Sequence, residues 1–389
     1  MKKSLIALAV LAASGAAMAQ SSVTLFGVVD ATIRYTDGNG SRWQLANSGY
    51  NSSRLGFRGT EDLGGGLSAS FWLEAGVNND NGTGSATSTN NTLAGSSTAL
   101  GATGNQGLTF NRRSTVSLAG SWGELRLGRD FVPYFWNTTI FDPFGTNGVG
   151  AVSNFTLAGM SIISGGALNT TAAGIRASNS IGYFMPNISG FYGQAMYAFG
   201  EQNNKSTGNT ATTTNCAVQM TPAGSSNACS SNGNVGSVRV GYANGPVDVA
   251  VGWGATTFAP SQQYYVTNIG ASWNFGVAKA MFLWNQEAAD TVTNTTLRSN
   301  VYMLGVSVPL GAGEVKGSYT WGNSTNDGLK GDQIALGYVY NLSKRTALYT
   351  TYSYINNDGK KAIYAMDGTT APKLGNSQWG LDFGVTHRF

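Results

Sequence analysis

The sequence is poor in the side chains on which enzymes and metal sites depend. Among 389 residues it has one histidine, His387, and two cysteines, Cys216 and Cys229. A single histidine close to the C-terminus leaves neither a base for an activated nucleophile nor a set of metal ligands. No paired-carboxylate motif stands out either. We therefore predict that the protein is not an enzyme and has no metal and no other cofactor.

Charge, proline and long apolar runs are scarce as well. Charged residues make up 11% of the chain, well below the roughly 25% of average soluble proteins. Prolines number 8, whereas glycines number 54 and aromatic residues reach 11%. The 23 basic and 19 acidic residues nearly balance, which argues against a nucleic-acid partner. Past the N-terminal segment no run of about 20 apolar residues occurs, so no transmembrane helix is expected.

The first 19 residues have the features of a signal peptide. Lys2 and Lys3 precede a short apolar run, and Ala17-Met18-Ala19 matches an A-x-A cleavage site. The run is too short for a membrane anchor, which is the alternative interpretation. We expect residues 1–19 to be removed and residues 20–389 to form one exported domain.

Apolar and polar residues alternate through most of the chain. In residues 25–35, Leu25, Val29 and Ile33 fall on one face, and Asp30 and Arg34 fall on the other. Such alternation predicts strands with one apolar and one polar face. The same period of two occurs in residues 51–59, 66–77, 313–321 and 332–342, and it is less regular in residues 277–287 and 345–354.

The connections between these segments fall into a short set and a long set. Short ones lie around residues 61–66, 120–123, 186–190, 244–246, 274–276, 310–313 and 342–345. Long polar ones lie at residues 36–50, 78–108, 131–174, 200–234, 255–263, 288–298, 323–330 and 355–376. About 16 strands with short turns on one rim and long loops on the other are typical of an outer-membrane barrel. A soluble β-sandwich or β-helix also alternates, but it seldom has this length or this sorting of turns.

The last residues support a closed sheet. The segment WGLDFGVTHRF, residues 379–389, keeps its alternation up to the terminal Phe389. A sheet in hydrocarbon must pair every backbone group, and it achieves this only by closing on itself. We therefore predict an all-β fold, a transmembrane 16-stranded antiparallel β-barrel, in which the last strand pairs with the strand that begins near Val23.

Several segments, in order along the chain, resemble the general porins of Gram-negative bacteria, in particular those of beta-proteobacteria. They are SSVTLFGVVDATIRY at the first strand, residues 51–76, residues 111–136, residues 175–201, and the ending GLDFGVTHRF. The resemblance runs nearly end to end. It implies a homotrimer of 16-stranded barrels in the outer membrane, among lipid and lipopolysaccharide. It also implies a third loop folded into each lumen, and a terminal Phe389 that is recognised by the barrel-assembly machinery.

The channel constriction is the expected functional site. The third loop, residues 131–174, is far longer than ordinary loops and begins next to Asp130. Its segment FDPFG resembles the loop-tip motif of the family, with Asp142 as the carboxylate, although the family often has a glutamate where this chain has Phe144. Alternation places six arginines on lumen faces: Arg34, Arg54, Arg58, Arg113, Arg126 and Arg176.

The resemblance adds weight to three of the arginines. Arg54 and Arg113 lie in strands that carry the arginine ladder of the family, and Arg129 matches an arginine at the root of the loop. A basic wall facing a sparsely acidic loop predicts a weak preference for anions. The alternative is that these arginines pair with strand carboxylates and only hold the barrel together.

The sequence favours a general diffusion porin for ions and small hydrophilic solutes. A substrate-specific channel is the alternative, which would need an aromatic slide or a dense basic cluster in the lumen. Cys216 and Cys229 lie in one polar loop of an exported chain, and this predicts a disulfide.

Overall fold

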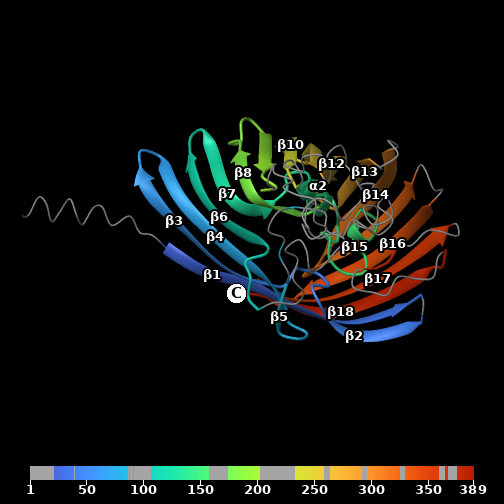
Figure 1. Ribbon diagram of the computed structural model, residues 1–389. Helices are drawn as coiled ribbons and strands as arrows, with labels where there is room; N and C mark the ends of the chain where they lie inside the picture. The colour runs from blue at the N-terminus through green and yellow to red at the C-terminus, as the bar shows by residue number, and fades with distance from the viewer. Residues whose placement is uncertain are drawn as a thin grey trace, which may run out of the picture.

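One antiparallel sheet forms nearly the whole molecule. The computed structural model describes residues 22–38, 40–85, 87, 91, 107–156, 174–201, 233–257, 263–290, 296–324, 329–358, 364–366 and 375–389. Within these residues the sheet has 18 strands, of which β2 (Ser41–Asn47) and β5 (Thr83–Gly84) are short additions, and the other sixteen close into a barrel (Figure 1). The predicted fold class is thereby confirmed. The predicted signal peptide lies outside the described residues.

The barrel strands follow one another around the wall in chain order. They are β1 (Ser22–Asp37), β3 (Arg54–Gly64), β4 (Leu67–Asn78), β6 (Arg113–Gly120), β7 (Gly123–Phe131), β8 (Arg176–Phe184), β9 (Phe191–Ala198), β10 (Val235–Asn244), β11 (Val247–Thr257), β12 (Gln263–Asn274), β13 (Lys279–Asp290), β14 (Thr296–Leu310), β15 (Gly313–Ser324), β16 (Lys330–Asn341), β17 (Thr346–Asp358) and β18 (Gln378–Arg388).

The first and last strands close the barrel, as the alternation to the end of the chain predicts. β1 pairs with β18 along Val28–Asp37, and its other edge pairs with β3 and then with β2. Beyond β18, Phe389 and Gly27 exchange both backbone hydrogen bonds, each at 3.1 Å. The Phe389 ring lies where a Cβ on Gly27 would stand. The last residue is therefore part of the seam, and no edge is left unpaired there.

Alternation sorts side chains between lipid and lumen. On β1, Leu25 and Ile33 are exposed on the outside, while Asp30 and Arg34 are buried inside. The two strands with irregular patterns also follow the rule: Met281 and Leu283 of β13, and Tyr349 of β17, point inward and are buried. The inward apolar side chains of β13 are explained by the loop that covers this part of the wall.

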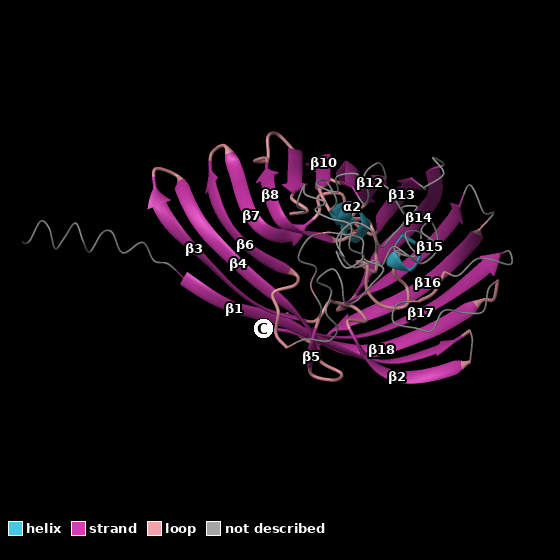
Figure 2. Cartoon of the chain, in the orientation of Figure 1, coloured by secondary structure: helices cyan, strands magenta, loops and turns pink. Residues whose placement is uncertain are grey.

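Short turns gather on one rim, as predicted. Strand pairs such as β3–β4, β6–β7, β10–β11 and β14–β15 are joined by two residues each, and Figure 2 shows several of these turns side by side. The expected long loop at residues 36–50 differs, because seven of its residues form strand β2, which pairs with β1. No described helix is long and apolar enough to cross a membrane.

The described part of the third loop lies inside the barrel. Its helix α2 (Phe135–Ile140) packs against β11, β12 and β13, and Figures 1 and 2 show the helix inside the ring of strands. Loop residues Val149, Val152 and Phe155 are fully buried against Leu283, Met303 and other inward side chains of β13, β14 and β17. This confirms the inward fold of the third loop for residues 132–156.

Candidate pore constriction

A cavity of about 780 Å³ lies between the third loop and the wall opposite it. The loop contributes residues from Phe131 to Ser153, and the wall contributes side chains of β1, β3, β4 and β8. Among the described residues, the cationic lining side chains outnumber the acidic ones by six to two. The cations are Arg54, Arg58, Arg112, Arg176, Lys316 and Arg388, and the acids are Glu74 and Asp142.

Both acids are already engaged. Glu74, on β4, accepts a hydrogen bond from Arg112 at 2.6 Å and one from the Trp72 indole at 3.0 Å, and it lies 3.8 Å from Arg54. Arg112 and Arg54 therefore share a single carboxylate. The net charge of this part of the lining is positive even after pairing.

Asp142 builds the tip of the loop. Its two carboxylate oxygens accept hydrogen bonds from the backbone N–H groups of Phe144, Thr146 and Val152, at 2.9–3.1 Å. Burial raises the pKa of this carboxyl above its usual range, although the three N–H groups act in the opposite direction. The residue is 4% exposed, so its carboxylate is enclosed by the loop that it shapes.

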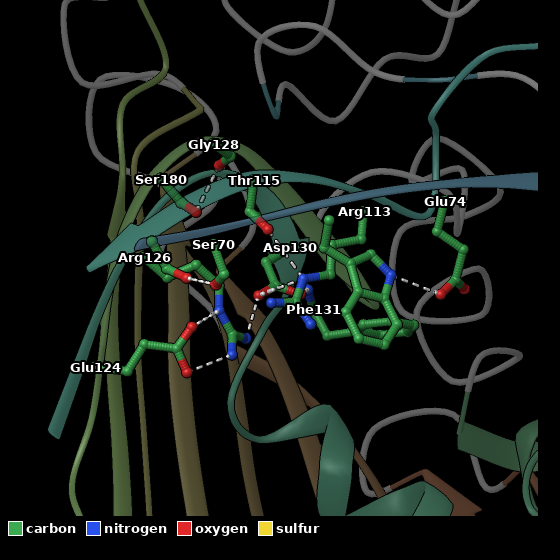
Figure 3. A network of polar contacts seen from close by, with 12 residues as sticks. Ser70, Glu74, Arg113, Thr115, Glu124, Arg126, Gly128, Asp130, Phe131 and Ser180 are labelled. Carbon is green, nitrogen blue, oxygen red and sulfur yellow. Dashed lines mark hydrogen bonds and ion pairs between the residues drawn. The ribbon is translucent and has the colours of Figure 1, made fainter. Parts of the chain in front are cut away.

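A second polar network lies along β6 and β7 (Figure 3). Arg126 donates hydrogen bonds to Glu124, at 2.9 and 3.0 Å, and to Asp130, at 2.6 Å. Arg113 lies 3.7 Å from Asp130 and donates to Thr115. Two arginines and two carboxylates thus compensate one another at the root of the loop. Asp130 belongs to this network, and its side chain points to the wall arginines.

Four of the predicted arginines do not line the cavity: Arg113 and Arg126 of this network, and also Arg34 and Arg129. Arg34 is 1% exposed and is held by Asp382 at 2.6 and 3.0 Å. Asp382 also accepts from the backbone N–H of Val149, so this pair fastens the loop to the barrel seam. Arg129 donates to the Asn111 carbonyl and to the Ser178 hydroxyl. Arg34 and Arg129 have structural contacts that strand alternation alone does not reveal.

The start of the loop is fastened by an amide ladder. Arg239 of β10 donates to the side-chain oxygen of Asn137 at 2.6 Å, and Asn137 donates to Asn268 of β12 at 2.8 Å. Asn268 in turn donates to the Tyr134 carbonyl and to Asn285. The helix α2 is therefore attached to neighbouring strands by buried polar contacts, each of which satisfies another buried group.

Segment 48–53 is a contributor that the sequence did not reveal. Asp30 accepts hydrogen bonds from the backbone N–H groups of Gly49, Tyr50 and Asn51 and from the Tyr349 hydroxyl. The segment lines the cavity with Tyr50, Asn51 and Ser52. Asp30 could have been noticed as the only carboxylate on the inner face of the first strand.

Lys316, Arg112 and Arg388 were also missed. Lys316 lies over the Tyr50 ring, at 4.6 Å from its centroid, and donates to the Pro143 carbonyl. The alternation in residues 313–321 places Lys316 inward, and this was a usable signal. Arg112 precedes its strand, where alternation gives little guidance, whereas the alternation in residues 379–389 places Arg388 on the same face as Asp382 and was a usable signal. Cys216 and Cys229, predicted to form a disulfide, lie outside the described residues.

Comparisons with known proteins agree with this geometry. A family model described as Gram-negative porin matches residues 5–360. The chain is 40% identical to outer membrane porin protein 32 of Delftia acidovorans over the full length of both, and 32% identical to an outer membrane porin protein of Bordetella pertussis over 92% of this chain and 95% of that one. The solved anion-selective porin from Comamonas acidovorans shares 36% identity with a TM-score of 0.74, covering 95% of this chain and 100% of that one.

Proposed function

Because the chain belongs to the Gram-negative porin family, and is a multi-pass β-barrel of the outer membrane, we propose that it is a general diffusion channel that prefers anions. Ions and small hydrophilic solutes would cross through the lumen without chemical change. The fold and the family are those of a channel rather than an enzyme. The observation that carries the anion preference is the excess of cations over acids around the cavity.

The physical reason is the field in a narrow, low-dielectric passage. Guanidinium groups stay protonated at all physiological pH values, so their positive potential is permanent. A channel whose wall carries an excess of one charge concentrates ions of the opposite sign and repels ions of the same sign. The carboxylates of Glu74 and Asp142 weaken this potential only partly, since one is shared by two arginines and the other is enclosed in the loop.

The similarity to a porin described as anion-selective supports the same preference. A substrate-specific channel is the second candidate, and the aromatic residues of the lining favour it more than the sequence did. They are Phe26, Tyr50, Trp72, Phe131, Phe135, Trp136, Phe144 and Phe389. Most of these rings contact protein cations or one another, so they offer no continuous free surface, and we retain the general channel.

We infer in addition that the protein is a homotrimer embedded in lipid and lipopolysaccharide. Exposed leucine, valine and isoleucine side chains around the outer face support contact with an apolar surrounding. The family supports the trimer. The exposed position of Phe389 at the seam supports its recognition by the barrel-assembly machinery.

Planar-bilayer recording tests the proposal. Purified protein should give large ohmic steps, in groups of three for a trimer. A KCl gradient should give a reversal potential of the sign expected for a channel that passes chloride more readily than potassium. A cation-selective reversal potential would overturn the anion preference. Block of the current by one solute at micromolar concentration would favour the substrate-specific channel instead.

A further inference from the structure

Strands β3, β4 and β6–β8 form the part of the barrel that we call the cationic wall, and its arginines are held in two ways. In one, carboxylates pair with guanidinium groups, as at Arg126 with Glu124 and Asp130, and the Arg126 guanidinium also lies 3.8 Å from the Phe184 ring centroid. In the other, guanidinium groups lie over aromatic rings. Arg58 lies 5.1 Å from the Trp72 ring centroid and 5.3 Å from that of Phe26, and Arg176 lies 4.1 Å from that of Phe131. The two kinds of support have different consequences for the field in the lumen.

The arginines with aromatic support include those that line the cavity without a carboxylate partner. Among the described residues, neither Arg58 nor Arg176 forms an ion pair. The Nε of Arg176 is buried and has no hydrogen-bond acceptor in that part of the chain. Both side chains line the cavity. The rings are therefore the main groups that fix the direction of these two cations.

The rings are themselves held in place. The indole of Trp72 donates to Glu74 at 3.0 Å and meets Phe26 edge to face at 4.9 Å. The guanidinium of Arg113 also lies over the Trp72 ring, 4.6 Å from its centroid. Phe131 stacks on Phe135 of α2 at 5.8 Å. Arg112 lies 5.8 Å from the Phe131 ring centroid. Trp72 therefore contacts both Arg58 and Arg113, and Phe131 contacts both Arg176 and Arg112.

We propose that Trp72 and Phe131 are positioning residues for anion passage, because they aim Arg58 and Arg176 into the lumen without cancelling their charge. An aromatic face attracts a cation through its quadrupole and carries no net charge. A carboxylate in the same place would hold the arginine as well, but would remove its contribution to the potential. This inference rests on the proposed anion preference and names the two rings that keep the uncompensated arginines directed into the lumen.

The test is a charge-neutral substitution that changes selectivity. Trp72→Leu removes the aromatic face and no charge. We expect the chloride-to-potassium permeability ratio in a KCl gradient to fall by about two-fold, because a cation–π contact at a partly exposed site is strong enough to change the occupancy of the aimed conformer a few-fold. Trp72→Phe, which keeps a ring, should retain most of the ratio. Trp253→Leu on the outer face of β11, where the ring is exposed to the surroundings, is the matched control and should leave the ratio unchanged.

A double-mutant cycle shows whether Trp72 acts through Arg58. In an Arg58→Gln background, Trp72→Leu should lower the ratio by less than it does in the wild type. A Trp72→Leu channel that folds and keeps the wild-type ratio would overturn the inference, and so would full additivity in the cycle. If the wild type shows no anion preference, the proposed function fails first. Should Trp72→Leu not assemble, the comparison of Trp72→Phe with Phe131→Leu decides, since only loss of a ring is expected to lower the ratio.

Discussion

The two sides of the lumen differ in what their inward side chains contact. On the cationic wall, formed by β3, β4 and β6–β8, inward residues include arginines, carboxylates and the rings between them, together with hydroxyl side chains such as Thr115 and Ser180. On the seating wall, formed by β10–β17, inward residues include Leu283 and Met303, which are buried by the third loop, and amides such as Asn268. One side faces the permeating solution, and the other side faces a loop.

The difference shows that the lumen of a wide barrel is not one environment. Inward apolar residues would be costly against water, yet Leu283 is 0% exposed because Val149 and Phe155 cover it. Where the wall lines the cavity, its inward side chains are mostly charged, polar or aromatic. The loop thus packs against one part of the wall and faces the cavity on its other side, where most of the cationic lining side chains lie.

Charge reversal on the cationic wall should have the largest effect on selectivity. Arg58→Glu changes the lining by two unit charges at a residue with no ion pair among the described residues. A change of about 1 kT in the lumen potential alters the anion-to-cation ratio by roughly seven-fold, because the two ions respond with opposite sign. We expect a shift of at least this order toward cations, measured as the reversal potential in a KCl gradient.

Arg42→Glu provides the control for that experiment. Arg42 lies on the short additional strand β2, is exposed and does not line the cavity, and the substitution changes the charge by the same two units. It should shift the reversal potential only slightly. Equal shifts in the two variants would mean that the overall charge of the protein, and not the cationic wall, sets the preference.

The difference between the two walls also explains which features of the site the sequence predicts and which it does not. Period-two alternation identified Arg54, Arg58, Arg113 and Arg176 as inward residues, since alternation depends only on the backbone. It could not separate Arg34, locked by Asp382, from Arg58, because the partner is 348 residues away. The inward apolar positions of β13 and β14 were a signal that something covers them, but which segment does so depends on tertiary packing.

Truncation on the seating wall should loosen the loop without changing charge. Leu283→Ala removes a fully buried side chain under Phe155 and should cost about 2–5 kcal/mol of local packing. We expect more low-frequency noise in the open-channel current and a lower midpoint of urea unfolding, with little change in the reversal potential. Leu304→Ala, at a lipid-exposed position on the next strand, should leave the noise at the wild-type level. Equal noise in both would show that the seating wall does not hold the loop.

The loop tip gives a smaller and more specific effect. Asp142→Asn keeps one acceptor oxygen where two oxygens now accept three backbone hydrogen bonds, so at least one buried N–H loses its partner at a cost of about 1–3 kcal/mol. We expect increased current noise and an almost unchanged reversal potential, because the carboxylate is enclosed. A clear shift toward anions would instead mean that Asp142 acts as an acidic pole of the constriction.

The smallest effect on selectivity is expected from a paired arginine. Arg126→Gln removes one unit charge, as Arg58→Gln does, but Arg126 is bound to Glu124 and Asp130 and is absent from the cavity lining. The two carboxylates compensate its charge within a few ångströms. In addition, salt screens interactions between solvent-exposed charges over about 8 Å at physiological ionic strength. The permeability ratio should change by less than about two-fold, and by less than in Arg58→Gln. Both arginines lie over aromatic rings, so the comparison isolates the effect of the carboxylates. Equal shifts of the reversal potential in the two variants, in KCl gradients at low and at high salt, would show that pairing with carboxylates does not distinguish the arginines of this wall.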